Sequence, residues 1–246
     1  DSNGAQSGEV VLADVLTSNG YGLRRARVRE RIGPLKDTKT FSRIAAKEHG
    51  IPEFFSEAAL QEAVRTKIPK EGCRLDFRQV PFVTIDPDDA RDFDDAIWAA
   101  PEGSGWRIRV AIADVAAFVP PGSALDREAR DRGNSVYFPD RVIPMLPEAL
   151  SAGICSLQEG EDRACLVAEL SLAENGSVHS AKIVRGLIRS AHRFTYSEAQ
   201  QIHDSGSKSY WKDILQPLWG AYGALVQARN ARQPLEISTH EFMIRL

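Results

Sequence analysis

The sequence predicts an α+β fold with a mixed, largely antiparallel sheet and several helices. Residues 107–115 alternate between apolar and polar side chains, a pattern typical of a half-buried strand. An Asn-Gly pair at residues 175–176 separates two strand-like runs and is a strong hairpin signal. Apolar residues recur at helical spacing within 218–225. Strands and hairpins combined with separate helices favour this fold class.

The first strands are expected at residues 9–16 and 23–32, joined by a turn-rich connector at 17–22. Alternation in the second strand separates a basic face from a partly apolar face. The basic face carries Arg25, Arg27, Arg29 and Arg31. Because two strands do not make an independent domain, this hairpin is expected to be the end of a β-domain.

Helices are expected over 40–50 and 56–66, followed by a connector at 69–72. A short apolar strand at 80–85 then leads into an acidic loop, and a second strand follows at 96–99. The acidic loop is therefore tied to apolar segments on both sides.

Two capping signals place later helices. Ser123 is expected to cap a helix that ends at Gly133. Thr195 and Glu198 form a capping box for a helix that extends through Ile202.

The remaining elements are a hairpin and a last helix. Strands over 163–172 and 178–189 flank the Asn-Gly turn. Pro217 suits the first turn of the last helix, where no N–H donor is needed. The apolar stripe expected on that helix is Leu218, Ala221, Tyr222 and Leu225.

Composition is that of a globular protein, with 43% hydrophobic and 26% charged residues among 246. No stretch approaches the roughly 20 apolar residues of a membrane span, and the first residues lack a signal-peptide pattern. Cys73, Cys155 and Cys165 lack the C-x-x-C spacing of a zinc site and are expected to be buried, reduced thiols. We therefore expect a cytoplasmic protein with no membrane partner.

The densest charge lies at residues 86–95, which hold six aspartates and one arginine, a formal charge of −5. Carboxylates this close repel one another, and burying them unpaired is costly. Phe93 and the following apolar residues hold the segment against its neighbours. A hard divalent cation such as Mg²⁺, which takes oxygen ligands, resolves this conflict.

Three other interpretations compete. A calcium-binding loop starting at Asp86 needs glycine sixth and glutamate twelfth, where Arg91 and Ile97 stand. An aspartyl-phosphate enzyme places its nucleophile after a strand, as Asp86 is placed, but the aspartates downstream do not fit that pattern. A solvated surface loop is the plain alternative.

The acidic segment reads Asp86-x-x-x-Ala90-x-Asp92-x-Asp94-Asp95-Ala96, and further spaced blocks follow it. These blocks are residues 109–115, 125–130, 135–139, 143–147, 155–157 and 193–196. The pattern and its order resemble the catalytic domain of the ribonuclease II and ribonuclease R family, and the match is closer to ribonuclease R.

The resemblance implies that Asp86, Asp92, Asp94 and Asp95 bind or position Mg²⁺, with Mn²⁺ as a substitute. It makes Asp92 and Asp94 the catalytic pair at the 3′-terminal phosphodiester of RNA. Asp88 and Asp89 occupy positions that the signature leaves open and are expected to be solvated.

Two tyrosines match RNA-binding positions of the family. Tyr137 corresponds to the tyrosine that stacks on the 3′-terminal base, although a partly buried core tyrosine is the alternative. Tyr196 corresponds to a second tyrosine near the nucleotide channel.

The implied function is processive, hydrolytic 3′→5′ degradation of single-stranded RNA to nucleoside 5′-monophosphates by a monomer. By the same resemblance, residues 1–35 are the last hairpin of a cold-shock-like OB-fold. Residues 36–80 are a helical connector, and 81–246 are the N-terminal part of the catalytic domain.

The family's later arginine-containing block and C-terminal β-barrel are not found in these residues. We therefore expect a fragment, whose activity in isolation is left open. The alternatives are a non-catalytic RNA-binding pseudo-enzyme and a calcium-stabilised structural module.

Overall fold

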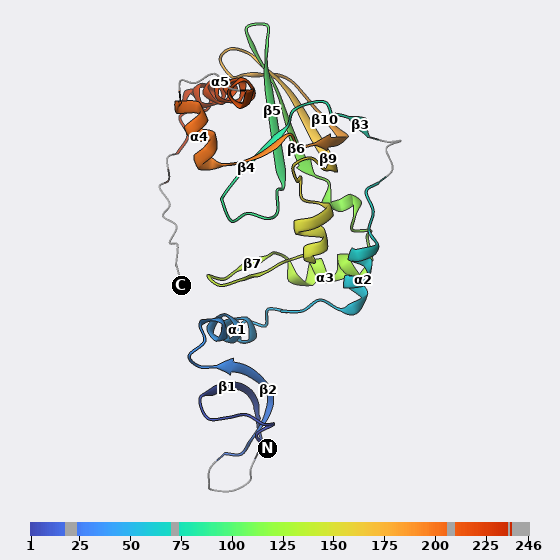
Figure 1. The fold of residues 1–246 in the computed structure, drawn as a ribbon, viewed down its shortest axis with the longest axis vertical. Helices are drawn as coiled ribbons and strands as arrows, with labels where there is room; N and C mark the ends of the chain where they lie inside the picture. Colours follow the sequence, from blue (N-terminus) through green and yellow to red (C-terminus); the bar gives the residue numbers. More distant parts are fainter. Residues whose placement is uncertain (18–23, 70–73, 206–209, 236, 238–246) are drawn as a thin grey trace. The chain divides into compact units, whose positions relative to one another are not determined.

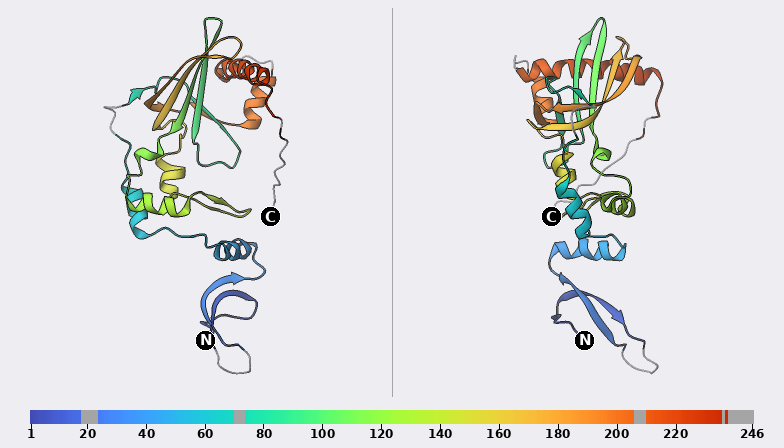
Figure 2. Two further views of the ribbon diagram at one scale, coloured as in Figure 1. Left: turned by 180° about the vertical axis from the view of Figure 1, so that it is seen from behind. Right: turned by 90° about the vertical axis from the view of Figure 1, so that its right-hand side faces the viewer.

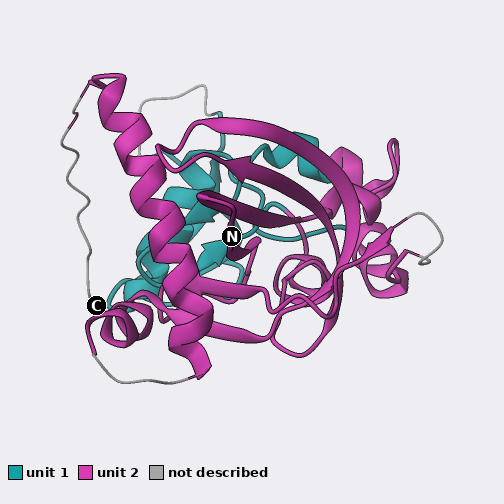
Figure 3. Cartoon of the chain, turned by 90° about the horizontal axis from the view of Figure 1, so that it is seen from above, with its two compact units in different colours: residues 1–56, 128–145, 239–246 teal, residues 57–127, 146–238 magenta. Residues whose placement is uncertain are grey.

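The computed structural model describes residues 1–17, 24–69, 74–205, 210–235 and 237 (Figure 1, Figure 2). The chain divides into two compact units (Figure 3). The described part of the first unit falls within residues 1–56 and 128–145. That of the second unit falls within residues 57–127 and 146–237.

The first unit begins with an antiparallel hairpin. Strand β1 (Glu9–Val15) pairs with β2 (Ala26–Pro34), as expected from the sequence, although most of the connector lies outside the described residues. The alternation also holds, because Val28 and Ile32 are less exposed than the arginines between them. The assignment of this hairpin to an OB-fold stays a prediction.

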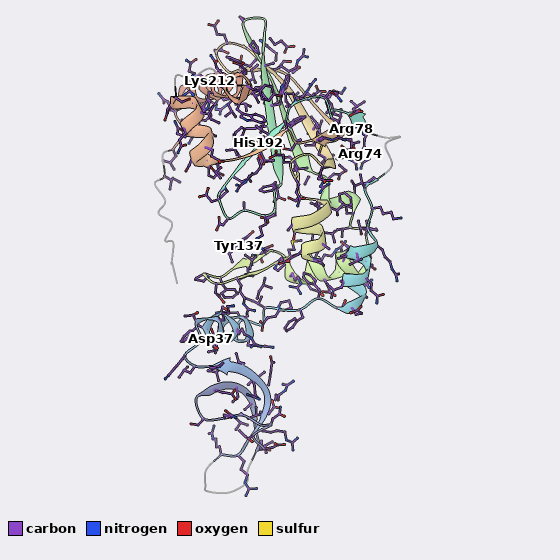
Figure 4. The ribbon with its side chains drawn as sticks, in the orientation of Figure 1. Asp37, Arg74, Arg78, Tyr137, His192 and Lys212 are labelled. Carbon is purple, nitrogen blue, oxygen red and sulfur yellow. The ribbon has the colours of Figure 1, made fainter. Side chains whose placement is uncertain are left out.

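Helix α1 (Thr38–Glu48) follows. Asp37 is its N-cap, and the Asp37 side chain accepts a hydrogen bond from the Lys39 N–H (Figure 4). Further along the chain, β7 (Val136–Tyr137) and β8 (Val142–Ile143) form a short antiparallel hairpin of the same unit. The helix expected at 40–50 is thus confirmed.

The second unit is built on a seven-stranded sheet in the order β11-β4-β5-β6-β9-β10-β3. The outer strands β3 and β11 pair in parallel with their neighbours, and the remaining pairs are antiparallel. The strands are β3 (Leu75–Asp76), β4 (Val83–Asp86), β5 (Asp95–Glu102), β6 (Gly105–Ala113), β9 (Asp162–Leu172), β10 (Val178–Arg189) and β11 (His192–Thr195). The mixed, largely antiparallel α+β class is confirmed.

Helices α4 (Tyr196–Asp204) and α5 (Tyr210–Ala231) cover one face of this sheet (Figure 2). Val83, Phe194 and Leu215 are buried where the helices meet the strands. The capping box at the start of α4 forms as expected, with hydrogen bonds in both directions.

A second core lies on the other face of the sheet, because successive side chains of a strand point to opposite faces. It includes Phe82, Leu157, Val167 and Ile188, all of which are fully buried. The acidic loop connects to this core through Phe93, which packs against it.

Other helical elements lie elsewhere in the described residues. They are α2 (Glu57–Arg65), a 3₁₀ turn η2 (Val115–Ala117), α3 (Ala124–Arg132) and a π-type turn η3 (Ala149–Ile154). The N–H of Asp126 donates to the Ser123 hydroxyl, and Gly133 ends α3 with a positive φ, which confirms both expected ends of that helix.

The expectation for the last helix was wrong in two respects. Pro217 lies inside α5, because the helix starts seven residues earlier, at Tyr210. Tyr222 and Leu225 are exposed, whereas Leu218 and Ala221 pack against the sheet. The proline leaves one helical hydrogen bond unmade, a cost that the packing of Leu215 on the core offsets.

Strand β6 shows a smaller departure. Ile108 and Val110 pack under α5 as the alternation predicts, but Ile112 is 45% exposed. Ile112 pairs with Asp95, at the end of the strand next to the acidic loop.

Cys155 and Cys165 are free and buried, as expected, and burial raises the pKa of each thiol to about 12. Cys73 lies outside the described residues. Among the described residues, no helix is both long and apolar enough to cross a membrane.

The turn of the β9–β10 hairpin generates a test of the packing under α5. Gly176 has φ +79°, and a Cβ atom there would overlap the Ala224 carbonyl of α5. We expect Gly176→Ala to lower the free energy of unfolding by about 3 kcal/mol, combining backbone strain with a steric clash. Gly160→Ala is the control, because Gly160 has φ +76° but open space around it. Its expected cost is about 1–2 kcal/mol in the same denaturant titration. Equal costs for the two variants would show that the contact with α5 is not tight.

Candidate functional site at the end of strand β4

The acidic loop joins two neighbouring strands of the sheet. Strand β4 ends at Asp86 and β5 starts at Asp95, so residues 87–94 bridge the two strands at one end of the sheet. Strand β11 lies on the other side of β4, and its Thr195 pairs with Asp86. The carboxylates therefore lie at the ends of adjacent strands, where a rigid scaffold holds them.

Backbone hydrogen bonds hold the second half of the loop. The Ser156 hydroxyl, which is fully buried, accepts from the Phe93 N–H at 3.0 Å and donates to the Arg91 carbonyl at 3.2 Å. The Phe93 carbonyl accepts from Leu157, and the Asp94 carbonyl accepts from Ala113, each at 2.8 Å. The positions of Asp92 and Asp94 are thus set by two neighbouring segments rather than by the loop alone.

Arg193 of β11 holds the first half of the loop. Its guanidinium donates to the Pro87 carbonyl at 2.5 Å and to the Asp88 carbonyl at 3.2 Å. The same group lies 5.6 Å from the centroid of the Phe93 ring. Sequence analysis missed this role. The signal was that Arg193 opens one of the family-like blocks, but its partners lie more than 100 residues away.

The aspartates perturb one another. Burial raises the pKa of the Asp86 carboxyl above its ordinary value. The Thr84 hydroxyl and the charge of Arg193 oppose this shift, and repulsion by Asp95 and Asp92 adds to it. Burial likewise raises the pKa of Asp94, with repulsion by Asp92 and Asp95 adding to it. The four aspartates of the signature therefore form one electrostatically coupled group.

Asp88 and Asp89 differ from this group. Both side chains are exposed, as expected for solvated loop charges. Their backbone serves the loop instead, because the Asp88 carbonyl accepts from Arg193.

The carboxylates of the acidic loop offer an oxygen ligand to a hard cation, but they do not form a complete coordination shell. The Oδ2 atom of Asp86 is buried and has no well-aligned hydrogen bond, so it is a carboxylate oxygen available to a cation. Within the part of the chain that the structure describes, however, no three His, Cys, Asp or Glu side chains lie close enough to share one ion. The arrangement fits an ion such as Mg²⁺, which keeps several waters and needs only one or two direct carboxylates.

The two predicted RNA-binding tyrosines are both on the surface. Tyr196 is the first residue of α4, next to the strand pair that carries Asp86, and it is 62% exposed. Tyr137 comes from β7 in the other unit and is 70% exposed (Figure 4). Burial in a core, the alternative for Tyr137, is therefore wrong.

Comparison with known proteins supports the pattern read from the sequence. The RNB domain model matches residues 74–246. The protein named ribonuclease R of Vibrio parahaemolyticus is 40% identical over 250 residues, which cover 97% of this chain and 30% of that protein. The chain thus spans about 30% of the length of this protein and of the ribonuclease R of Vibrio cholerae, to which it is 41% identical.

Solved structures agree. Mycoplasma genitalium RNase R in complex with ribose-methylated single-stranded RNA superposes with a TM-score of 0.88 at 27% identity, over 99% of this chain and 39% of that one. The same protein in complex with double-stranded RNA gives a TM-score of 0.83 over 94% of this chain and 42% of that one, also at 27% identity. The resemblance stated from the sequence is confirmed, and this chain belongs to the RNB domain family.

Proposed function

We propose that this chain is part of a magnesium-dependent 3′→5′ exoribonuclease that degrades single-stranded RNA processively to nucleoside 5′-monophosphates. The observation that carries the proposal is the coupled group of Asp86, Asp92, Asp94 and Asp95 at the end of β4, in a chain of the RNB domain family. Relatives named ribonuclease R support the reaction class. We further propose that the protein is cytoplasmic and works as a monomer.

The four aspartates would hold Mg²⁺, with Mn²⁺ as a substitute, and Asp92 and Asp94 would act closest to the reacting phosphodiester. A bound divalent ion supplies Lewis-acid stabilisation of charge on the phosphoryl oxygens. The protein itself fixes the geometry, since Ser156 and Arg193 hold the two halves of the loop. Burial raises the pKa values of Asp86 and Asp94, and cation binding would relieve the mutual repulsion that adds to this effect.

RNA would be held by stacking on exposed aromatic side chains. Tyr137 and Tyr196 offer the surface that stacking needs, and every base has a π-face, so such contacts tolerate any sequence. The structures of Mycoplasma genitalium RNase R in complex with ribose-methylated single-stranded RNA and with double-stranded RNA support RNA as the partner.

One observation favours a second candidate for the isolated chain. This chain spans about 30% of the length of the two Vibrio ribonuclease R proteins that it matches. The fragment on its own would then bind RNA without cleaving it, whereas the whole protein would cleave.

The proposed direction of degradation can be tested on the full-length protein. A 5′-labelled single-stranded RNA with a free 3′ end should be shortened to a small oligonucleotide, with release of nucleoside 5′-monophosphates. The same RNA with a blocked 3′ end should resist, and DNA of the same sequence should be cut poorly, because an RNA channel can sense the 2′-hydroxyl. Equal degradation of blocked and free ends would refute the proposal.

Asp94→Asn in the full-length protein tests the assignment of the carboxylates. Turnover should fall at least about 10²-fold, because the amide is a poorer ligand for a hard cation. Without metal, the variant should be as stable as the native protein or more stable at neutral pH. When folding raises the pKa of a carboxyl, the free energy of unfolding falls as the pH rises through that pKa. Asparagine does not ionise, so the variant avoids this loss of stability.

The matched control is Asp88→Asn, which makes the same change at an exposed position of the same loop. It should leave turnover nearly unchanged. Turnover, RNA affinity and the thermal shift on adding Mg²⁺ should be measured for both variants. Damage of similar size from the two substitutions would mean that the wrong carboxylates have been assigned.

Tyr137→Ala tests the stacking role. It should weaken the handling of short RNAs more than that of long ones, because a long RNA keeps many phosphate contacts and a short one depends on stacking. The expected loss of binding free energy for a short RNA is about 1–3 kcal/mol, which is observed as a higher KM. If kcat/KM falls by the same factor for both lengths, the side chain does not stack on the terminal base.

A further inference from the structure

A buried carboxylate in the first unit is surrounded by three cations. The side chain of Glu53, which follows α1, is only 4% exposed. The Arg141 Nη1 atom lies 2.8 Å from its Oε2, and Arg43 Nε and Lys47 Nζ each lie 3.9 Å from a carboxylate oxygen. Both carboxylate oxygens lack a well-aligned hydrogen bond, so the attraction is mainly Coulombic.

The cations link Glu53 to the β1–β2 hairpin. Lys47 Nζ lies 2.8 Å from Glu30 of β2, and Arg43 lies 3.7 Å from the same carboxylate. Arg43 also donates to the Ile32 carbonyl of β2. Helix α1 therefore carries the charges that connect Glu53 to this strand.

On its other side Glu53 reaches the β7–β8 hairpin through Arg141. Arg141 Nε donates to the Ser42 hydroxyl at 3.2 Å, and this hydroxyl donates to Asp140 Oδ2 at 2.9 Å. Asp140 and Arg141 lie in the turn between β7 and β8, so the turn is fixed to α1 at two successive residues.

This turn determines where Tyr137 is presented. Tyr137 pairs with Val142 directly beside the turn, and the Phe138 N–H donates to the Arg141 carbonyl at 2.8 Å. The hairpin has only two pairs of residues, which is too few to hold its own geometry. What anchors the turn therefore contributes to the position of β7, which carries the exposed Tyr137.

The energetics make a purely stabilising role a poor explanation of Glu53. Removing a carboxylate from water is expensive, and an apolar side chain of similar volume often serves stability as well or better. A buried ion pair that joins three segments instead defines one arrangement of those segments. We propose that Glu53 is a positioning residue that, through Arg141, fixes the β7–β8 turn so that Tyr137 can stack on the 3′ end of RNA. This inference rests on the proposed function and deepens it.

The test compares Glu53→Gln, Tyr137→Ala and the double variant in the full-length protein, with KM and kcat measured on a short and a long RNA. Glu53→Gln should raise KM for the short RNA about fivefold and leave kcat within about twofold. The effect should disappear in the Tyr137→Ala background, because the tyrosine through which Glu53 acts is gone. Glu48→Gln is the matched control, since it makes the same change at an exposed position in α1, and it should leave KM unchanged.

The outcomes of these measurements separate the positioning role of Glu53 from the stacking role of Tyr137. If Glu53→Gln raises KM for the short RNA by the same factor in the native and the Tyr137→Ala backgrounds, the positioning role is wrong and the proposed function stands. An unchanged KM in Tyr137→Ala alone would overturn both the stacking role and this inference.

If Glu53→Gln does not fold, Ser42→Ala replaces it, because it removes the bonds to Asp140 and Arg141 without leaving a buried charge unpaired. Ser42→Ala should then show the same KM increase and the same dependence on Tyr137, and the absence of either would refute the inference.

Discussion

Repulsion among the aspartates at the end of β4 is the constraint on which the candidate site depends. A loop with a formal charge of −5 would relax by spreading into solvent, and burial and mutual repulsion raise the pKa values of Asp86 and Asp94. Contacts from outside the loop prevent this relaxation. Ser156 binds the backbone of the second half, and Arg193 binds that of the first. The fold stores an unfavourable charge arrangement that a divalent cation would relieve.

The cation that holds this loop, Arg193, binds its backbone rather than its carboxylates. Arg193 donates to the Pro87 and Asp88 carbonyls, and its charge lowers the pKa of Asp86 only as a minor contribution. An arginine that paired directly with the aspartates would neutralise them and compete with a metal ion. Holding the backbone keeps the carboxylate oxygens available, and the Oδ2 of Asp86, which has no well-aligned hydrogen bond, is the clearest case.

Features that depend on neighbouring residues could be predicted from the sequence. The Asn-Gly hairpin, the Thr195 capping box and the end of α3 at Gly133 all formed as expected, because each is decided within a few residues. Pro217 was misplaced because packing of Leu215 on the sheet extends the helix past a residue that local propensity puts at its start. The aspartate loop could be found from its pattern. Arg193 opens a family-like block, but its contact with the loop could not be predicted, since only the parallel pairing of β11 with β4 brings it there.

Glu53 and the aspartate loop show why charge counts along a sequence do not reveal a site. The aspartates are crowded in sequence, and the nearby cation binds backbone instead of neutralising them. Glu53 is a single glutamate with no acidic neighbour, yet three cations from α1 and the β7–β8 turn surround it. The first arrangement leaves negative charge unmatched, as the proposed cation site requires. The second pairs Glu53 with cations that also bind Glu30 of β2, as a rigid junction between segments requires. Whether charge serves binding or positioning is thus decided by which segments the fold brings together.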